Sequence, residues 1–130
     1  MNKETIILST INITPLLKAN NALSDALGRV KDDLDRDGAI QRFEFSYELA
    51  WKTMKRILQH QGIIVNNPRA TFREAALQGL INNPEQWFVF LEKRNQTVHV
   101  YDEDVAKEIF ASLPAFKIAL DSFIQHILVL

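Results

Sequence analysis

A chain of 130 residues with 47% hydrophobic and 24% charged residues has the size and composition of one globular domain with one core. It contains no cysteine, which excludes disulfide bonds, thiolate zinc sites and a cysteine nucleophile, and we expect a cytoplasmic protein. The net charge of −1 argues against broad nucleic-acid binding, so contact with RNA requires a local cluster of arginine and lysine. The apolar patch Ile6-Ile7-Leu8 is too short for a membrane span or a signal-peptide core.

The N-terminal part of the chain predicts an arm followed by a helix. Residues 1–13 contain several β-branched residues without helical spacing, so we expect an extended or loose arm there. Thr14 and Pro15 are typical of a helix N-cap and a first helical position. Apolar residues then recur at steps of three and four as far as Leu34, which predicts an amphipathic helix.

Further helices are predicted from apolar spacing and from residues that begin or end helices. Two aspartates and a glycine at positions 35–38 interrupt the spacing, so Asp35 or Asp37 is expected to cap the second helix and Gly62 to end it. Pro114 is expected to kink or divide the last helix. The expected helices after the first span about 37–61, 72–80 with Thr71 as the cap, 84–94, and a last helix that opens at 101–104. We therefore predict an all-α fold, an antiparallel bundle of about five helices.

A polar segment at the junction of the last two helices carries the chemistry that the sequence suggests. Arg94 and His99 are separated by four residues, and Tyr101 follows two positions later. A histidine can accept or donate a proton near neutral pH, and an arginine can hold a phosphate through two parallel hydrogen bonds. Together these groups suggest cleavage of an RNA backbone without a metal ion. Asn95 is a candidate to fix the phosphate or the imidazole ring, and Tyr101 to donate a hydrogen bond.

Spacing alone favours a structural interpretation, in which the arginine pairs with Glu92 or Asp102 and the histidine starts a helix. The whole run 94–102, however, resembles the signature of HEPN domains and looks more closely like the HepT subgroup, which carries Arg-x4-His-x-Tyr. The run 37–52 is similar to one found in proteins named nucleotidyltransferase substrate-binding proteins. This similarity covers most of residues 14–128 in order and spacing.

The resemblance implies a HEPN domain over residues 14–130, with a four-helix up-and-down core and a homodimeric assembly. In such a dimer two Arg-x4-His segments face each other and form a metal-independent RNase site, with Arg94 and His99 as the catalytic residues. The resemblance also implies a toxin of a type VII-like toxin–antitoxin pair, neutralised by a cognate minimal nucleotidyltransferase that adenylylates Tyr101. The added AMP would bring bulk and negative charge into a pocket built for phosphate.

Two alternatives stay open: a non-catalytic substrate-binding subunit of a two-chain nucleotidyltransferase, and a helical interaction module that has kept the motif without activity. Asp37 and Glu44 match the family's run and are candidates for a supporting role. Glu44 and Glu48 also suit a surface or interface position, where Glu48 can pair with Lys52 one turn later. The three histidines lack ligand spacing and no glycine-rich phosphate loop is present, so we expect neither a metal nor a cofactor.

Overall fold

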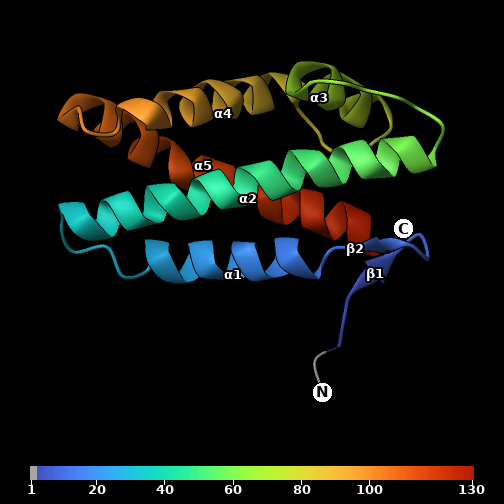
Figure 1. Cartoon of the computed structure of the whole chain (residues 1–130), viewed down its shortest axis with the longest axis horizontal. Helices are drawn as coiled ribbons and strands as arrows, with labels where there is room; N and C mark the ends of the chain where they lie inside the picture. The colour runs from blue at the N-terminus through green and yellow to red at the C-terminus, as the bar shows by residue number, and fades with distance from the viewer. Residues whose placement is uncertain (1–2) are drawn as a thin grey trace.

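The computed structural model describes residues 3–130 and shows a helical bundle with a short hairpin at its N-terminal end (Figure 1). Its elements are β1 (Ile6–Ile7), β2 (Ile11–Asn12), α1 (Thr14–Leu27), α2 (Asp33–His60), α3 (Pro68–Leu77), α4 (Pro84–Gln96), the 3-10 helix η1 (Thr97–His99) and α5 (Glu103–Leu128). The colour ramp shows that α1, α2, α4 and α5 alternate in direction, while the shorter α3 lies between α2 and α4 in the chain. The predicted all-α bundle of about five helices is confirmed.

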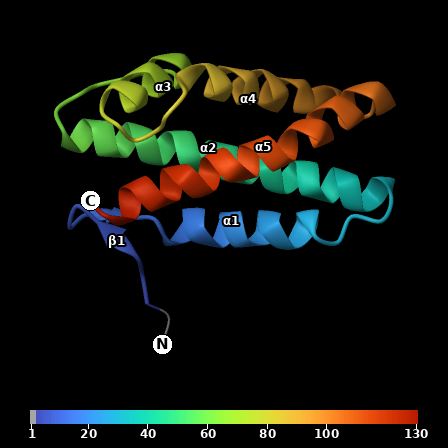
Figure 2. The same ribbon diagram turned by 180° about the vertical axis from the view of Figure 1, so that it is seen from behind.

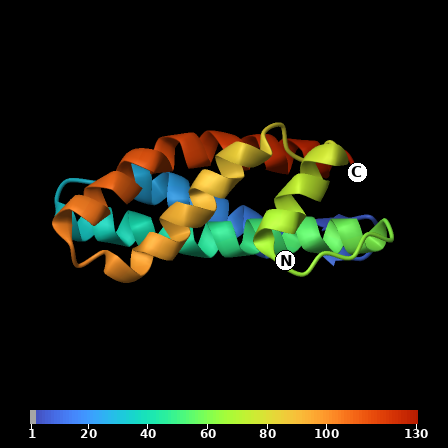
Figure 3. The ribbon, with the colours of Figure 1, turned by 90° about the horizontal axis from the view of Figure 1, so that it is seen from above.

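α2 is the central helix of the bundle. It lies between α1 on one side and α3 and α4 on the other, and α5 packs along it (Figures 1 and 2). Seen from above, α4 crosses α2 obliquely (Figure 3). Aromatic rings fill the centre, where Phe116 of α5 packs edge-on against Phe43 and Phe90 with ring centroids 4.8 and 5.1 Å apart. Burial of this apolar surface is the dominant favourable contribution to folding.

The start of α2 differs from the prediction. α2 begins at Asp33 with Asp32 as its N-cap, and the Asp32 side chain accepts a 2.8 Å hydrogen bond from the backbone N–H of Asp35. Aspartates in the first turn are favoured by the positive end of the helix dipole. The predicted break around Gly38 is therefore wrong. The helix is capped at Asp32, before the predicted caps, and a glycine inside a helix costs only about 1 kcal/mol relative to alanine. The chain turns instead after α1, at Gly28, so the first helix is shorter than predicted.

Within the predicted extended or loose arm, residues 6–12 form an extended hairpin that packs on the core, while residues 1–2 lie outside the described part of the chain. β1 and β2 pair antiparallel, with Ile7 opposite Ile11. Ile7, Ile11 and Ile13 are at most 4% exposed and belong to the hydrophobic core. The backbone N–H of Thr5 donates to the hydroxyl of Thr14 at 2.7 Å, which ties the hairpin to the start of α1. Burial of these three isoleucine side chains stabilises the ordered conformation of this short segment.

α3 departs from the predicted pattern, and in α5 one of the two outcomes expected of Pro114, a divided helix, does not occur. Asn67 caps α3 by accepting a 2.9 Å hydrogen bond from the N–H of Ala70, so the helix starts earlier than predicted. Thr71, the predicted cap, lies inside the helix, where its hydroxyl donates to the Asn67 carbonyl at 2.8 Å. α5 remains one helix with Pro114 inside it, and is not divided. Buried side chains on both sides of the proline, among them that of Phe116, hold α5 against the core.

Two predicted boundaries are confirmed. α2 ends at His60, and Gly62 has a φ of +83°, in the left-handed region that glycine adopts at helix ends. α4 begins at Pro84, and the Asn83 side chain caps it by accepting a 3.0 Å hydrogen bond from the N–H of Glu85. Within residues 3–130, no helix has the length and apolar character that a membrane crossing requires.

Candidate active site

The motif segment connects α4 to α5 at one end of the bundle, in the orange part of the ribbon (Figure 1). α4 ends at Gln96, η1 follows, and Asp102 caps α5 by accepting hydrogen bonds from two backbone N–H groups of its first turn. The Thr97 hydroxyl donates to the carbonyl of Arg94 at 2.7 Å, inside the turn that ends α4. The helix therefore changes from α to 3-10 geometry between Arg94 and His99.

His99 and Tyr101 contact each other directly. Nδ1 of His99 lies 3.1 Å from the hydroxyl oxygen of Tyr101, and the two rings meet edge-to-face with centroids 5.8 Å apart. Both side chains are open to solvent, and Tyr101 is 82% exposed. Within residues 3–130, Nε2 of His99 has no hydrogen-bond partner. The contact fixes one ring nitrogen and leaves the other free for a proton transfer with a ligand.

Arg94 is anchored by a carboxylate on α2. Its Nε lies 3.4 Å from one oxygen of Glu48, at an angle that makes the contact an ion pair and not a hydrogen bond. The other oxygen of Glu48 accepts a 3.1 Å hydrogen bond from the indole N–H of Trp51, and Lys52 lies 3.8 Å away. In the part of the chain that the structure describes, the two terminal nitrogens of Arg94 have no hydrogen bond or ion pair. They form an open fork that suits a phosphate.

Glu48 is therefore a site residue whose role the sequence does not show. The expected pairing of Glu48 with Lys52 is present, but the same carboxylate also positions Arg94. The structural interpretation that pairs Arg94 with Glu92 or Asp102 is wrong, since the partner comes from α2. The only sequence signal is local: Glu48 lies one turn before an indole that can hold its carboxylate on the helix surface.

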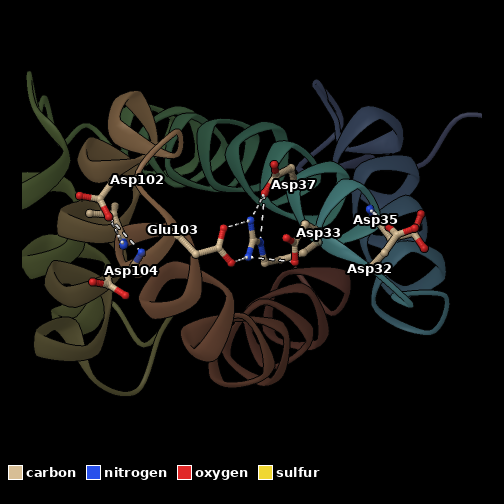
Figure 4. Close-up of polar contacts among 9 residues, drawn as sticks. Asp32, Asp33, Asp35, Asp37, Asp102, Glu103 and Asp104 are labelled. Atoms are coloured by element: carbon tan, nitrogen blue, oxygen red, sulfur yellow. Dashed lines mark hydrogen bonds and ion pairs between the residues drawn. The ribbon is translucent and has the colours of Figure 1, made fainter.

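Asp37 belongs to a charge network that joins α2 to the first turn of α5 (Figure 4). Arg36, only 7% exposed, donates to the two carboxylate oxygens of Glu103 at 2.6 and 3.3 Å, and to Asp37 at 3.1 Å. Asp33 lies 3.5 Å from the same guanidinium. The hydrogen bond with Glu103 raises the pKa of Arg36, and the same bond lowers the pKa of the Glu103 carboxyl. Because Glu103 follows Tyr101 by two residues, this network fixes the chain beside the motif tyrosine.

The network predicts a pH-dependent stability. The pKa of Glu103 is held below its usual 4.5 by the hydrogen bond from Arg36, so its contribution is present above pH 4.5 and is lost as the pH falls through the lowered pKa. Glu103→Gln is expected to lower the free energy of unfolding at pH 7, with a difference from wild type that narrows below pH 4.5. Urea unfolding monitored by circular dichroism measures it. Asp104→Asn is the control, because Asp104 lies in the same turn and has no ion pair in the described part of the chain. Equal effects of both variants would contradict the assignment.

Among residues 3–130, two predicted supporting residues form no hydrogen bond or ion pair with the motif side chains. Glu44 is half-buried on α2, one turn before Glu48, and has no ion pair within residues 3–130. Asn95 is exposed at the end of α4, and its side chain has no hydrogen bond to another described residue. Among the described residues, histidine and carboxylate side chains form no cluster of three or more that could hold a metal ion.

Tyr47, on α2 one position before Glu48, carries a buried hydroxyl. It is 1% exposed, and its hydroxyl has no hydrogen-bond partner in the described part of the chain. Burial raises the pKa of this phenol, and the negative charge of Glu48 adds to the rise, whereas the positive charges of Arg94 and Arg69 lower it. The sequence indicates only a core residue here. The positive charges that act on this phenol belong to Arg69 of α3 and Arg94 of α4.

Comparison with known proteins identifies relatives over most of the chain. The family model described as nucleotidyltransferase substrate binding protein like matches residues 11–128. A Haemophilus influenzae protein named probable ribonuclease HepT is 37% identical over 95 residues, and the match covers 69% of this chain but 65%, just under two thirds, of that protein. A solved Haemophilus influenzae structure, described as revealing the fold of a substrate binding domain of a nucleotidyltransferase, is 30% identical with a TM-score of 0.83, over 89% of this chain and 98% of that chain. A solved Thermus thermophilus structure is 28% identical with a TM-score of 0.81, over 86% and 98% of the two chains.

Proposed function

This chain belongs to the family described as nucleotidyltransferase substrate binding protein like, and from that premise we propose that it is a metal-independent endoribonuclease of the HepT type. The observation that carries the proposal is the exposed imidazole of His99, fixed through Nδ1 by Tyr101 and free at Nε2 among the described residues. Arg94 adds a guanidinium with an open terminal fork, five residues earlier in the same segment. The similarity to a protein named probable ribonuclease HepT supports the same activity.

The proposed reaction uses the 2′-hydroxyl of RNA as the nucleophile. His99 removes the proton from this hydroxyl, the 2′-oxygen attacks the adjacent phosphorus, and the bond to the 5′-oxygen breaks. The departing oxygen takes a proton from the same histidine of a second protomer, which gives a 2′,3′-cyclic phosphate and a free 5′-hydroxyl. Arg94 stabilises the negative charge that builds on the phosphate, and Asn95 assists in holding it.

A homodimer is part of this proposal, because one protomer supplies one motif histidine and the reaction needs both a base and an acid. The motif itself exposes an apolar side chain, Val98, which is 66% accessible. Phe45 and Val89 are 48% and 46% exposed. Apolar side chains with exposed fractions this large are suited to an interface between subunits. Sedimentation of the purified chain would measure the assembly, and a strictly monomeric, fully active enzyme would contradict the two-histidine site.

We further propose that a cognate minimal nucleotidyltransferase neutralises the chain, as a type VII-like antitoxin, by adenylylating Tyr101. The tyrosine is 82% exposed and is therefore accessible to a partner enzyme. A phosphodiester on the phenol oxygen crowds the contact between that oxygen and Nδ1 of His99 and sets a negative charge beside the imidazole. That charge repels the RNA phosphate, and the loosened imidazole loses its orientation. Asp37 supports the site from a distance, through Arg36 and Glu103.

The modification predicts a simple contrast between the two tyrosines of the chain. Incubated with the purified nucleotidyltransferase, ATP and Mg²⁺, the wild type is expected to gain the mass of AMP, and Tyr101→Phe is expected to gain none. Tyr47→Phe is the matched control, because that phenol is 1% exposed and its loss should leave the modification unchanged. Intact-protein mass spectrometry gives the answer. Equal labelling of Tyr101→Phe and wild type would reject Tyr101 as the acceptor.

The second candidate is a non-catalytic substrate-binding subunit of a two-chain nucleotidyltransferase. It is favoured by the description of the solved Haemophilus influenzae relative as a substrate binding domain. Induced expression in a host that lacks the nucleotidyltransferase separates the two functions. Growth arrest with new RNA fragments supports the nuclease, whereas soluble expression with intact total RNA and normal growth supports the binding subunit.

A further inference from the structure

Two arginines of α3 converge on one aromatic ring of α4. Arg69 and Arg73, one helical turn apart, each place the guanidinium carbon 5.4 Å from the centroid of the Phe88 ring. Phe88 is half-buried and packs against Phe72 on its inner side, with ring centroids 6.3 Å apart. Both arginines are exposed. The ring therefore holds two cationic groups together at the surface through cation–π attraction.

This pair of charges is not neutralised by the described part of the chain. Like charges four residues apart on a helix repel each other, and Arg69 also lies in the first turn of α3, where the helix dipole disfavours a cation. That turn contains no acidic residue. Within residues 3–130, neither arginine has a carboxylate within 4.0 Å. An anion that binds between Arg69 and Arg73 would remove both the mutual repulsion and the unfavourable contact with the helix end.

Arg69 and Arg73 contact the Phe88 ring of α4, the helix that also carries Arg94. Phe88 and Arg94 belong to the same helix and are six residues apart, a rise of about 9 Å along the α4 axis. The positive charges of the arginine pair and of Arg94 thus lie beside the same helix. An RNA strand, as a polymer of phosphates, is long enough to contact both.

We propose that Arg69, Arg73 and Phe88 form an RNA-binding subsite that holds the strand beyond the phosphate at Arg94. This inference rests on the proposed function, since it assigns the substrate's path on the same enzyme. Guanidinium groups bind phosphate oxygens through paired hydrogen bonds, and arginine planes on an aromatic ring also offer a surface on which a base can stack. Two arginines one turn apart on α3, together with a third on the neighbouring α4, favour a ligand with repeated phosphates over a single free anion. Their contacts are to the backbone, so the subsite adds affinity without selecting a sequence.

The test uses a fluorescent single-stranded 2′-O-methyl RNA, whose phosphates are intact but whose 2′-oxygen cannot attack. Anisotropy titrations over a range of KCl concentrations compare the wild type with the double variant Arg69→Gln, Arg73→Gln. The double variant is expected to bind about tenfold more weakly, and the slope of log affinity against log salt should shrink by about 1.4, for two lost contacts at about 0.7 each. On cleavable RNA it should raise KM and leave kcat unchanged, since the lost contacts are the same in the ground and transition states.

The matched control is the double variant Lys18→Gln, Arg56→Gln. It removes the same charge from exposed residues elsewhere: Lys18 lies on α1, and Arg56 lines a hollow with Thr10 and Ile11 of the hairpin region. Its affinity and salt slope should match the wild type, and thermal unfolding should show that all variants remain folded. A tenfold loss confined to the α3 variant supports the subsite.

Other outcomes separate the subsite from the nuclease. Equal affinity and equal salt slope for wild type and the α3 variant, or a wild type that binds no RNA, would overturn the subsite even where cleavage is normal. An α3 variant that keeps its RNA affinity but loses binding to the purified nucleotidyltransferase would overturn it in favour of a protein-docking surface. A wild type that binds the 2′-O-methyl strand through Arg69 and Arg73 but cuts no RNA would retain the subsite and reject the proposed nuclease.

Discussion

Replacing His99 with alanine is expected to lower the rate of RNA cleavage by about 10²- to 10⁴-fold, the usual contribution of a positioned general acid–base. The loss should appear in kcat, because the imidazole acts on the proton that is transferred in the transition state and not on the bound phosphate. The loss of fold stability should be small, since His99 is exposed and the hydrogen bond of its side chain, among residues 3–130, is to the exposed Tyr101. Single-turnover cleavage of a labelled RNA by the purified chain measures the rate directly.

The chain contains its own control for this experiment. His60→Ala removes another exposed histidine, at the end of α2, and should leave the cleavage rate unchanged. Thermal unfolding of both variants checks that neither has lost its fold. If His99→Ala cuts RNA as fast as the wild type, the catalytic assignment fails, whatever the growth phenotype of the cell.

Arg94→Ala should reduce kcat by about 10²- to 10³-fold, the typical cost of losing one preorganised group that stabilises charge in a transition state. Arg94→Lys should recover only part of this loss, because an ammonium retains the charge but lacks the planar fork for two phosphate oxygens. Glu48→Gln is expected to give a smaller loss through the same group, since it weakens the 3.4 Å ion pair that anchors Nε and leaves the fork present. Steady-state kinetics on all three variants would rank them in that order.

Lys93→Ala is the control for the arginine series. Lys93 precedes Arg94 in the last turn of α4, so its removal makes the same change in charge at the same helix end. A modest rise in KM with an unchanged kcat is expected, as for a general loss of attraction to RNA. Equal kinetic losses in Lys93→Ala and Arg94→Ala would mean that charge density alone matters, and would remove the specific role of Arg94.

The kinetic series also separates the two proposed functions. A nuclease requires that His99 and Arg94 act on the same phosphate, so the losses of the two single variants should not add in the double variant. A substrate-binding subunit requires no cleavage by the wild type, and its variants should instead alter the nucleotidyltransferase reaction. The two sets of measurements use the same purified proteins.

Much of the fold could be predicted because its signals are local. The spacing of apolar residues gives the buried faces of the helices, and Asn83-Pro84 and Gly62 mark helix ends through backbone chemistry that acts over a few residues. The boundaries that were wrong had competing local signals. Asp32, Asp33, Asp35 and Asp37 all suit a helix start, and packing selects among such candidates.

The sequence by itself determined the number of helices, the bundle and the segment with the arginine, the histidine and the tyrosine, because each depends on residues a few positions apart. Only the tertiary structure decided that Glu48 anchors Arg94, and that Arg36 ties Glu103 to α2. Glu48 and Arg94 are 46 positions apart in the sequence, and Arg36 and Glu103 are 67 positions apart. No local pattern therefore encodes these pairs. They exist because packing of α2 against α4 and α5 brings charges together that the chain keeps far apart.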